Sequence, residues 1–181
     1  MTDKKPKAGI KPFTKAFWAL SRVRQEAFLK NLYDLSPQNK ALFAARLGED
    51  NTKVFEDLKK EVHKETLNRV GKFRKIRLSK LNEILRNANK FALPMHQQID
   101  LKAEVWMGMV AFVISKSYLP ERYQVATARQ LDQYFKMVSD HILEKSEVEE
   151  RMEKDKQLLL KLFEQGHYLP HIEEVYIKWF V

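Results

Sequence analysis

One stretch of the chain decides the fold: Trp106-Met107-Gly108-Met109-Val110-Ala111-Phe112-Val113-Ile114. It contains no charged side chain, and the Trp106 indole is its only side-chain hydrogen-bonding group. An apolar run of this length fits either a buried strand or a buried helix. The surrounding sequence extends the segment well past strand length, and Pro94 and Pro120 bound it. We therefore predict a central helix over residues 97–119 that is covered by neighbouring helices on most sides.

Apolar residues recur at steps of three and four along most of the remaining chain, which is the pattern of amphipathic helices. The first such stripe runs over residues 13–35, and Ser36-Pro37 then reads as the N-cap and first residue of a second helix. Further along the chain, Ser79 and Ser146 each precede a new stripe, so we expect each to cap a helix. The sequence therefore predicts an all-α fold of about seven to eight helices, arranged as a bundle or as a short stack of helical hairpins.

The domain organisation follows from where this periodicity begins. Residues 1–12 lack it and contain Pro6, Gly9 and Pro12, so we expect a flexible basic tail. Residues 13–181 are long enough to bury a core, and we expect them to form a single all-helical domain.

Two side-chain clusters carry specific packing predictions. Met109 and Phe112 lie one helical turn apart in the central apolar run and should be fully buried. Near the carboxyl end, Tyr176, Trp179 and Phe180 are spaced for one face of a short helix, so at least part of this cluster should pack on the rest of the protein.

Composition limits the chemistry and the location of the protein. The 181 residues include no cysteine, which excludes disulfides, thiolate nucleophiles and cysteine-ligated zinc. The basic N-terminal residues are not followed by an apolar run of the signal-peptide type. The central apolar run is shorter than the ~20 residues needed to cross a bilayer. We therefore expect a cytoplasmic protein that makes no contact with a membrane.

The net charge of +9 is concentrated in two segments. Residues 1–15 hold five lysines against Asp3, a local charge of +4. Residues 69–90 hold eight cations against Glu83, a local charge of +7. These two segments sum to +11, so the other residues together carry −2. Clustered charge produces a field that the same charge scattered over the surface would not, and it points to an anionic partner.

No motif in the sequence identifies an enzyme. A Gly-rich phosphate loop, an HExxH element and a G-x-S-x-G element are all missing. His167 and His171 have the spacing of a helical metal-binding pair, but Gly166 and Pro170 interrupt the segment, so we predict no metal site there.

The remaining candidates for chemistry have simpler interpretations. Asp100 and Glu104 lie one helical turn apart, where two carboxylates can share a proton or a cation. Acidic residues also favour the first turns of a helix because of its dipole, and we prefer this interpretation. His63 lies on a charged helix and is expected to be solvated. We predict no catalytic residue and no cofactor, and leave enzymatic activity open.

Residues 74–120 follow a distinctive order of features: a basic linker, Leu78-Ser79-Lys80, an amphipathic helix, and an apolar helix that ends in Ser115-Lys116-Ser117-Tyr118-Leu119-Pro120. In this order of features, the middle of the chain resembles a family of small, uncharacterised bacterial helical proteins. The resemblance implies a helical fold in a bacterial setting. The family is a domain of unknown function, so the resemblance implies no activity and no site residues.

The leading functional hypothesis is a non-enzymatic module that binds nucleic acid or a nucleoprotein complex through residues 69–90 and the N-terminal tail. Clustered Lys and Arg bind phosphates through counterion release, and arginine favours bidentate contacts. An exposed aromatic side chain within such a strip can stack on a base. The alternative is a protein–protein adaptor with an acidic partner, and an enzyme is less favoured. The oligomeric state stays open. The candidate binding residues are Arg69, Lys72, Phe73, Arg74, Lys75, Arg77, Lys80, Arg86 and Lys90.

Overall fold

The computed structural model describes residues 10–47, 51–67, 75–116, 120–141, 144–167 and 169–181. These residues form nine α-helices, and no strand occurs among them, which confirms the predicted all-α class. The helices are α1 (Ile10–Trp18), α2 (Arg22–Asp34), α3 (Pro37–Arg46), α4 (Thr52–Glu65), α5 (Leu78–Lys90), α6 (Met95–Ile114), α7 (Glu121–His141), α8 (Lys145–Glu164) and α9 (Pro170–Phe180).

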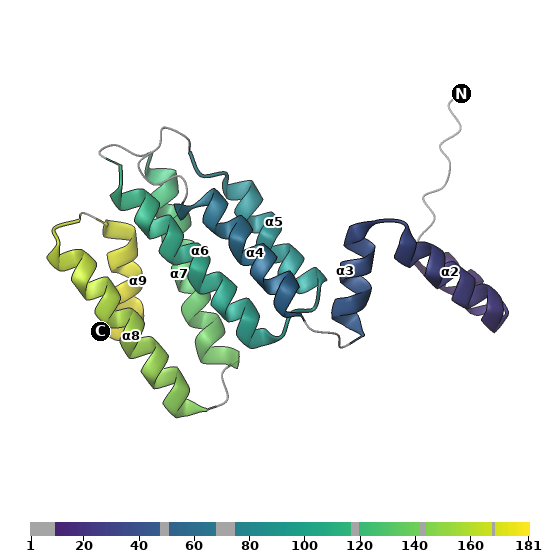
Figure 1. Ribbon diagram of the computed structural model, residues 1–181. Coiled ribbons are helices and arrows are strands. Elements are labelled where there is room, and N and C mark those ends of the chain that lie inside the picture. The colour runs from purple at the N-terminus through teal and green to yellow at the C-terminus, as the bar shows by residue number, and fades with distance from the viewer. Residues whose placement is uncertain (1–9, 48–50, 68–74, 117–119, 142–143, 168) are drawn as a thin grey trace, which may run out of the picture.

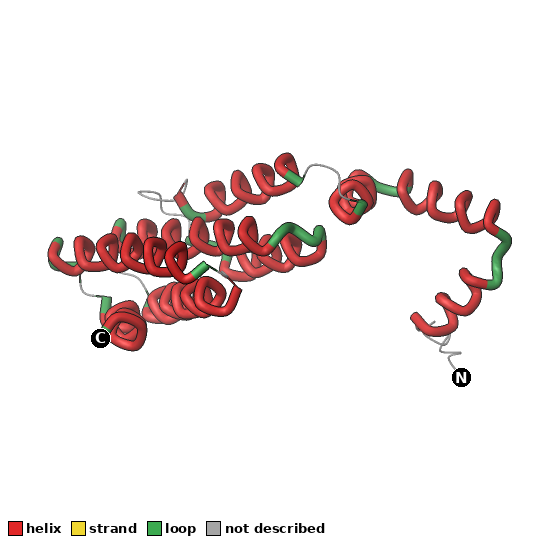
Figure 2. The backbone as a smooth tube through the Cα atoms, turned by 90° about the horizontal axis from the view of Figure 1, so that it is seen from below, coloured by secondary structure: helices red, strands yellow, loops and turns green. Residues whose placement is uncertain are grey.

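The helices fall into two groups in space. Helices α4–α9 lie side by side, with α6 and α7 in the middle, α4 and α5 on one side and α8 and α9 on the other (Figure 1). Helices α1–α3 lie to one side of this group and extend away from it, as a second view also shows (Figure 2). We call residues 10–47 the arm and the described residues from 51 to 181 the body.

Helix α6 is the centre of the body and packs against α4, α5 and α7. Its buried residues lie on most sides of the helix, as predicted for the central apolar run, and the remaining stripe includes Met107, which is exposed. Met109 and Phe112 are 1% and 0% exposed, which confirms the prediction for both. The helix begins directly after Pro94 and ends at Ile114, earlier than predicted, and residues 117–119 lie outside the described residues.

Helices α4 and α6 approach each other closely at Gly108 of α6. A Cβ atom at this position would lie 2.7 Å from the Cβ atom of Thr66, which no ordinary contact permits. Thr66 is fully buried at the C-terminal end of α4, and its hydroxyl donates to the Val62 carbonyl at 2.8 Å. The missing side chain of Gly108 therefore lets α4 end directly against the backbone of α6.

The predicted helix over residues 13–35 is in fact two helices, α1 and α2. The chain turns at residues 19–21, and Ser21 is extended with φ −61° and ψ 154°. The side-chain amide of Gln25 donates to the carbonyls of Phe17 and Leu20 at 3.2 and 3.1 Å, so it satisfies acceptors at the end of α1. This turn explains why the helix count exceeds the prediction. Helix α1 also starts at Ile10, inside the segment expected to be a tail, and residues 1–9 lie outside the described residues.

Of the three serine caps predicted, one is confirmed. The Ser36 hydroxyl accepts a hydrogen bond from the Asn39 backbone N–H at 3.1 Å. Ser79 and Ser146 lie inside α5 and α8 instead. The extended residues before these helices are Arg77 and Glu144, so each helix starts ahead of the serine that was expected to cap it.

The C-terminal helix α9 packs on the body as predicted. The rings of Trp179 and Phe180 contact Phe135 of α7, with centroid distances of 5.8 and 5.2 Å. The Trp179 indole donates to Asp132 at 2.8 Å, and Phe180 also contacts Tyr176. None of the described helices is long and apolar enough to cross a membrane.

Candidate nucleic-acid interface

The predicted basic strip is only partly within the described residues. Arg69, Lys72, Phe73 and Arg74 lie outside them. The described members precede or belong to α5, whose inner side holds Leu81 and Ile84, both buried. The strip residues that the structure places are Lys75, Arg77, Lys80, Arg86 and Lys90.

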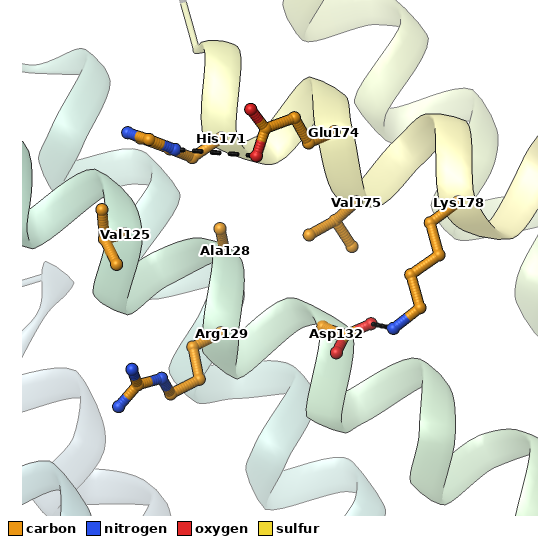
Figure 3. Close-up of a pocket in the computed structure, with 8 residues that line it drawn as sticks. All are labelled: Val125, Ala128, Arg129, Asp132, His171, Glu174, Val175 and Lys178. Atoms are coloured by element: carbon orange, nitrogen blue, oxygen red, sulfur yellow. Dashed lines mark hydrogen bonds and ion pairs between the residues drawn. The ribbon is translucent and has the colours of Figure 1, made fainter.

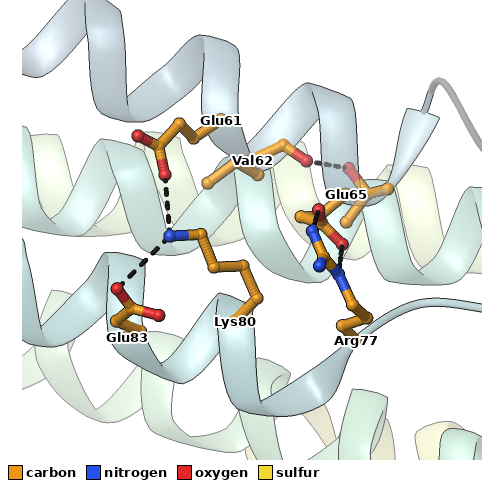
Figure 4. A network of polar contacts seen from close by, with 7 residues as sticks. Glu61, Val62, Glu65, Arg77, Lys80 and Glu83 are labelled. Carbon is orange, nitrogen blue, oxygen red and sulfur yellow. Dashed lines mark hydrogen bonds and ion pairs between the residues drawn. The ribbon is translucent and has the colours of Figure 1, made fainter.

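Arg77 and Lys80 are engaged by acidic residues of the body (Figure 4). The Arg77 guanidinium pairs with the buried Glu65 carboxylate of α4, and its Nε lies 3.1 Å from Glu65 Oε2. The Lys80 ammonium lies 3.4 Å from Glu61 and 3.3 Å from Glu83. The hydrogen bonds that these two basic groups donate to the carboxylates raise the pKa of both. This part of the strip therefore links α4 to α5, and its positive charge is largely offset.

Arg86 lies on a different side of α5, beside an open groove of about 520 Å³. No carboxylate among the described residues lies within ion-pair distance of Arg86, whose Nε donates to the Asn82 backbone carbonyl at 3.3 Å. The groove residues from α5 follow one helical stripe, at steps of three and four. None of the described lining residues is acidic. They are Ser79, Asn82, Leu85, Arg86, Asn89, Lys102 and Gln133.

Lys102 contributes the second cation of the groove from the central helix. Its side chain is 6% exposed, and its ammonium donates to the amide oxygens of Gln130 and of Gln133, the latter at 2.7 Å. The Gln130 amide nitrogen in turn lies 3.4 Å from the Asn82 side-chain oxygen. These contacts tie α5, α6 and α7 together by neutral hydrogen bonds, so the charge of Lys102 is not cancelled by a carboxylate.

Burial lowers the pKa of Lys102 from its usual 10.5 to about 8, because the ammonium loses much of its hydration. At neutral pH the group is still mostly protonated. Its hydrogen bonds to Gln130 and Gln133 hold the charge at a fixed place beneath the open groove. The sequence contained a signal for this residue, since Lys102 is the only lysine between Pro94 and Ile114 in the helix predicted to be most buried.

A second hollow, of about 390 Å³, lies between α7 and α9 (Figure 3). Its charged groups are largely paired with one another: Lys178 lies 2.6 Å from Asp132, and the His171 Nδ1 atom lies 3.8 Å from Glu174. His171 also pairs with Glu121 through Nε2 at 3.1 Å. These contacts hold the C-terminal helix in place. They leave fewer polar groups available to a ligand than the groove beside α5 offers.

The two carboxylates considered for acid–base chemistry face different partners. Glu104 accepts hydrogen bonds from Lys59 and His63 of α4, each at 2.8 Å. Burial alone would raise the pKa of Glu104, but these two partners lower it overall. Asp100 instead pairs with Arg151 of α8. The prediction of a solvated His63 was therefore wrong, and both carboxylates join helices rather than act as a pair.

No sequence pattern predicted the buried network that joins α7 and α8. The Tyr134 hydroxyl donates to the Asp155 carboxylate at 2.6 Å and accepts from Arg151 Nε at 3.0 Å. Burial raises the pKa of Asp155, and burial together with the Asp155 charge raises the pKa of Tyr134. The first turns of α8 are almost wholly charged, a pattern that favours exposure to solvent, so this contact was not predicted. Among the described residues, no group of three or more His, Asp or Glu could hold a metal ion.

Comparison with known proteins gives no relative from which a function could be transferred. The sequence matches no protein-family model, and no curated protein or solved structure matches it either. The resemblance to a family of small bacterial helical proteins therefore stays a prediction.

Proposed function

We propose that the protein is a non-enzymatic module that binds nucleic acid through the groove beside α5. The observation that carries the proposal is the lining of this groove. Two cations, Arg86 and Lys102, occur there among amide and hydroxyl groups, and no acidic residue lines it among the described residues. A phosphate needs positive charge and hydrogen-bond donors, and both are present in the groove.

The amide side chains support the choice of nucleic acid over a simple anion. Asn82, Asn89 and Gln133 each carry both a donor and acceptors, which is what recognition of a base edge requires. Arginine can bind phosphate or guanine bidentately. Exposed Lys90 extends the positive charge along the last turn of α5. The proposal therefore assigns phosphate contacts to Arg86, Lys90 and Lys102 and base contacts to the amides.

The proposed binding surface is the part of the predicted strip around Arg86, and it leaves out Arg77 and Lys80. Arg77 and Lys80 already have carboxylate partners, so a phosphate would have to compete with Glu65, Glu61 and Glu83. Arg86 has no such competitor among the described residues. Variants of Arg77 would disturb the contact between α4 and α5, and they are therefore poor tests of binding.

The test is a titration of fluorescein-labelled single-stranded DNA, duplex DNA and RNA with the full-length protein, followed by anisotropy at low salt. The groove variant N82A/R86Q/N89A changes three exposed residues of α5 and should fold normally. We expect it to weaken binding by roughly tenfold or more. The slope of log affinity against log salt should become shallower by about 0.7–0.9 for each phosphate that the variant no longer binds.

The matched control is K154Q/Q157A/Q165A, which removes one cation and two amides from exposed positions of α8 and its C-terminal end. We expect this variant to bind within about twofold of wild type. Equal losses in the two triple variants would show that net charge alone drives binding. Failure of the wild-type protein to bind any of the three nucleic acids at low salt would refute the proposal.

A further inference from the structure

The arm exposes apolar side chains to an extent that the body does not. No residue of α1 or α2 is buried. Eight of the fifteen exposed large apolar residues in the described structure belong to residues 10–47. They are Ile10, Phe13, Trp18, Val23, Leu29, Tyr33, Leu35 and Leu47. Large exposed apolar patches on soluble domains mark interaction sites.

The arm nevertheless has a defined internal arrangement. The Phe28 ring of α2 contacts Phe13 and Phe17 of α1, with centroid distances of 5.8 and 5.7 Å. Tyr33 of α2 meets Phe43 of α3 edge to face at 6.0 Å. Phe13 is still 46% exposed, so the aromatic cluster is covered on one side only. The arm is therefore an ordered but incomplete helical assembly that another element could complete.

The distribution of the exposed residues indicates what kind of surface would cover them. Val23 and Leu29 are six residues apart on α2, which places them about 120° apart around the helix axis. Both are exposed, at 75% and 41%. A flat lipid surface contacts one side of a helix, whereas the helices of a partner protein can pack on several sides. A protein partner therefore fits this distribution better.

Charge indicates the chemistry of that partner. Residues 10–47 contain seven cations and two carboxylates, a net charge of +5. The two carboxylates already have partners, since Glu26 pairs with Arg22 and Asp34 with Lys40. Among the described residues, no carboxylate lies within ion-pair distance of the other exposed cations that the structure describes. These are Lys11, Lys15, Arg24 and Lys30.

We propose that the arm docks an acidic helical partner protein, whose amphipathic helices cover the Phe13–Phe17–Phe28 cluster and pair with the arm's lysines and arginines. Such helix-in-groove recognition uses apolar anchors at steps of three and four, and opposite charge speeds and orients the encounter. A second copy of the arm would bring +5 against +5, so charge opposes dimerisation through this surface. The site is separate from the groove beside α5.

The test uses two synthetic helical peptides that share leucines at heptad positions a and d and carry either glutamates or lysines elsewhere. Each dye-labelled peptide is titrated with the full-length protein and followed by anisotropy. Emission of Trp18, which is 69% exposed, should shift to shorter wavelength on binding, and W18F should lose this shift. We expect the acidic peptide to bind at least about tenfold more tightly than the basic peptide.

Two variants locate the binding surface. The arm variant W18S/V23S/L29S removes three exposed apolar side chains and should weaken binding of the acidic peptide by roughly tenfold or more. The matched control L158S/I177S/V181S removes three exposed apolar side chains from the body and should bind as wild type does. Circular dichroism and the melting temperature show that each variant is folded. The groove variant N82A/R86Q/N89A should also bind the peptide normally, which separates this proposal from the proposed nucleic-acid function.

Three results would overturn the docking proposal. Equal binding of the acidic and basic peptides, or no binding of either, would refute the proposal that the arm selects an acidic partner. Arm-dependent binding to phosphatidylcholine–phosphatidylglycerol vesicles without peptide binding assigns the surface to lipid. Sedimentation velocity that shows dimers abolished by W18S/V23S/L29S assigns it to a second copy of the chain.

Discussion

The arm and the body are built from similar amphipathic helices, but only the body buries their apolar stripes. Leu81, Ile84 and Ala88 of α5 are covered by neighbouring helices, whereas Phe28 and Leu32 of α2 occupy a similar stripe and stay partly exposed. The period of a stripe predicts a helix and its inward side. It does not reveal whether the element that covers this side belongs to the same chain. For the arm, we propose that it belongs to another protein.

The largest expected effect tests this contrast with one substitution in each region. Met109→Asp places a charge where the side chain is 1% exposed, and we expect it to lower the free energy of unfolding by on the order of 5 kcal/mol. Val23→Asp, at a position 75% exposed, should change it by less than about 0.5 kcal/mol. Urea denaturation measures both. Similar losses in the two variants would mean that the arm is packed as tightly as the body.

The next effect concerns the pH dependence of stability, through Lys102 in the body. Its folded pKa of about 8 lies below its usual 10.5, so between these values the unfolded chain binds more protons than the folded protein. The contribution of Lys102 to stability therefore rises as pH increases through this window and is lost as pH falls through about 8. At about 1.4 kcal/mol per pKa unit, the change is on the order of 3 kcal/mol.

This pH dependence can be measured as the difference in unfolding free energy between wild type and Lys102→Met. We expect the stability of wild type relative to Lys102→Met to rise between about pH 8 and pH 10.5. The control compares Lys102→Arg with Lys102→Met. Arginine does not titrate in this range, so the difference in unfolding free energy between these two variants should stay constant with pH. Parallel pH curves for wild type and Lys102→Met would show that Lys102 is solvated like an ordinary surface lysine.

A smaller effect tests how closely the helices of the body approach one another. Gly108→Ala brings a Cβ atom against Thr66, and such overpacking costs about 1–3 kcal/mol, partly offset by the better helix propensity of alanine. Gly166→Ala is the comparison, because it has open space but a positive φ of 76°, where a side chain costs about 1 kcal/mol. Thermal unfolding measures the change in stability of each of these two variants. A stabilised Gly108→Ala would show that α4 moves away from α6 without cost.

Much of the fold could be predicted because it depends on local pattern. The apolar run around Met109, the two flanking prolines and the Ser36 cap are readable from neighbouring residues. The break between α1 and α2 was missed because the apolar stripe continues through it, and the turn depends on how the Gln25 side chain reaches back to Phe17 and Leu20. Such a contact leaves no mark on hydrophobic periodicity.

The site was less predictable, because charge pairing joins residues far apart in the sequence. Glu65 and Arg77 are 12 residues apart, and Asp100 and Arg151 are 51 apart. Counting charges along the chain placed Arg77 with Arg86 in a single basic surface. The fold separates them, because one faces α4 and the other faces the groove. Whether a cation is paired with a carboxylate therefore depends on the helix that lies next to it. It does not depend on how many cations the sequence segment contains.

The smallest expected effect on overall stability comes from the arm's own aromatic cluster. Phe28→Ser removes the ring that contacts both Phe13 and Phe17, so α1 should separate from α2. Because no residue of these two helices is buried, we expect the global free energy of unfolding to change by less than about 1 kcal/mol. Hydrogen–deuterium exchange should become faster in residues 10–34 and stay unchanged in α6 and α7.

The comparison variant for this experiment is Phe135→Ser in the body, where the fully buried ring contacts Tyr134, Trp179 and Phe180. Its removal should lower the free energy of unfolding by about 3–5 kcal/mol and accelerate exchange throughout the body. Faster exchange in α6 after Phe28→Ser would mean that arm and body unfold together. Exchange confined to the arm would show that the arm folds and unfolds on its own, and binding of the acidic helical peptide should then slow exchange selectively in residues 10–34.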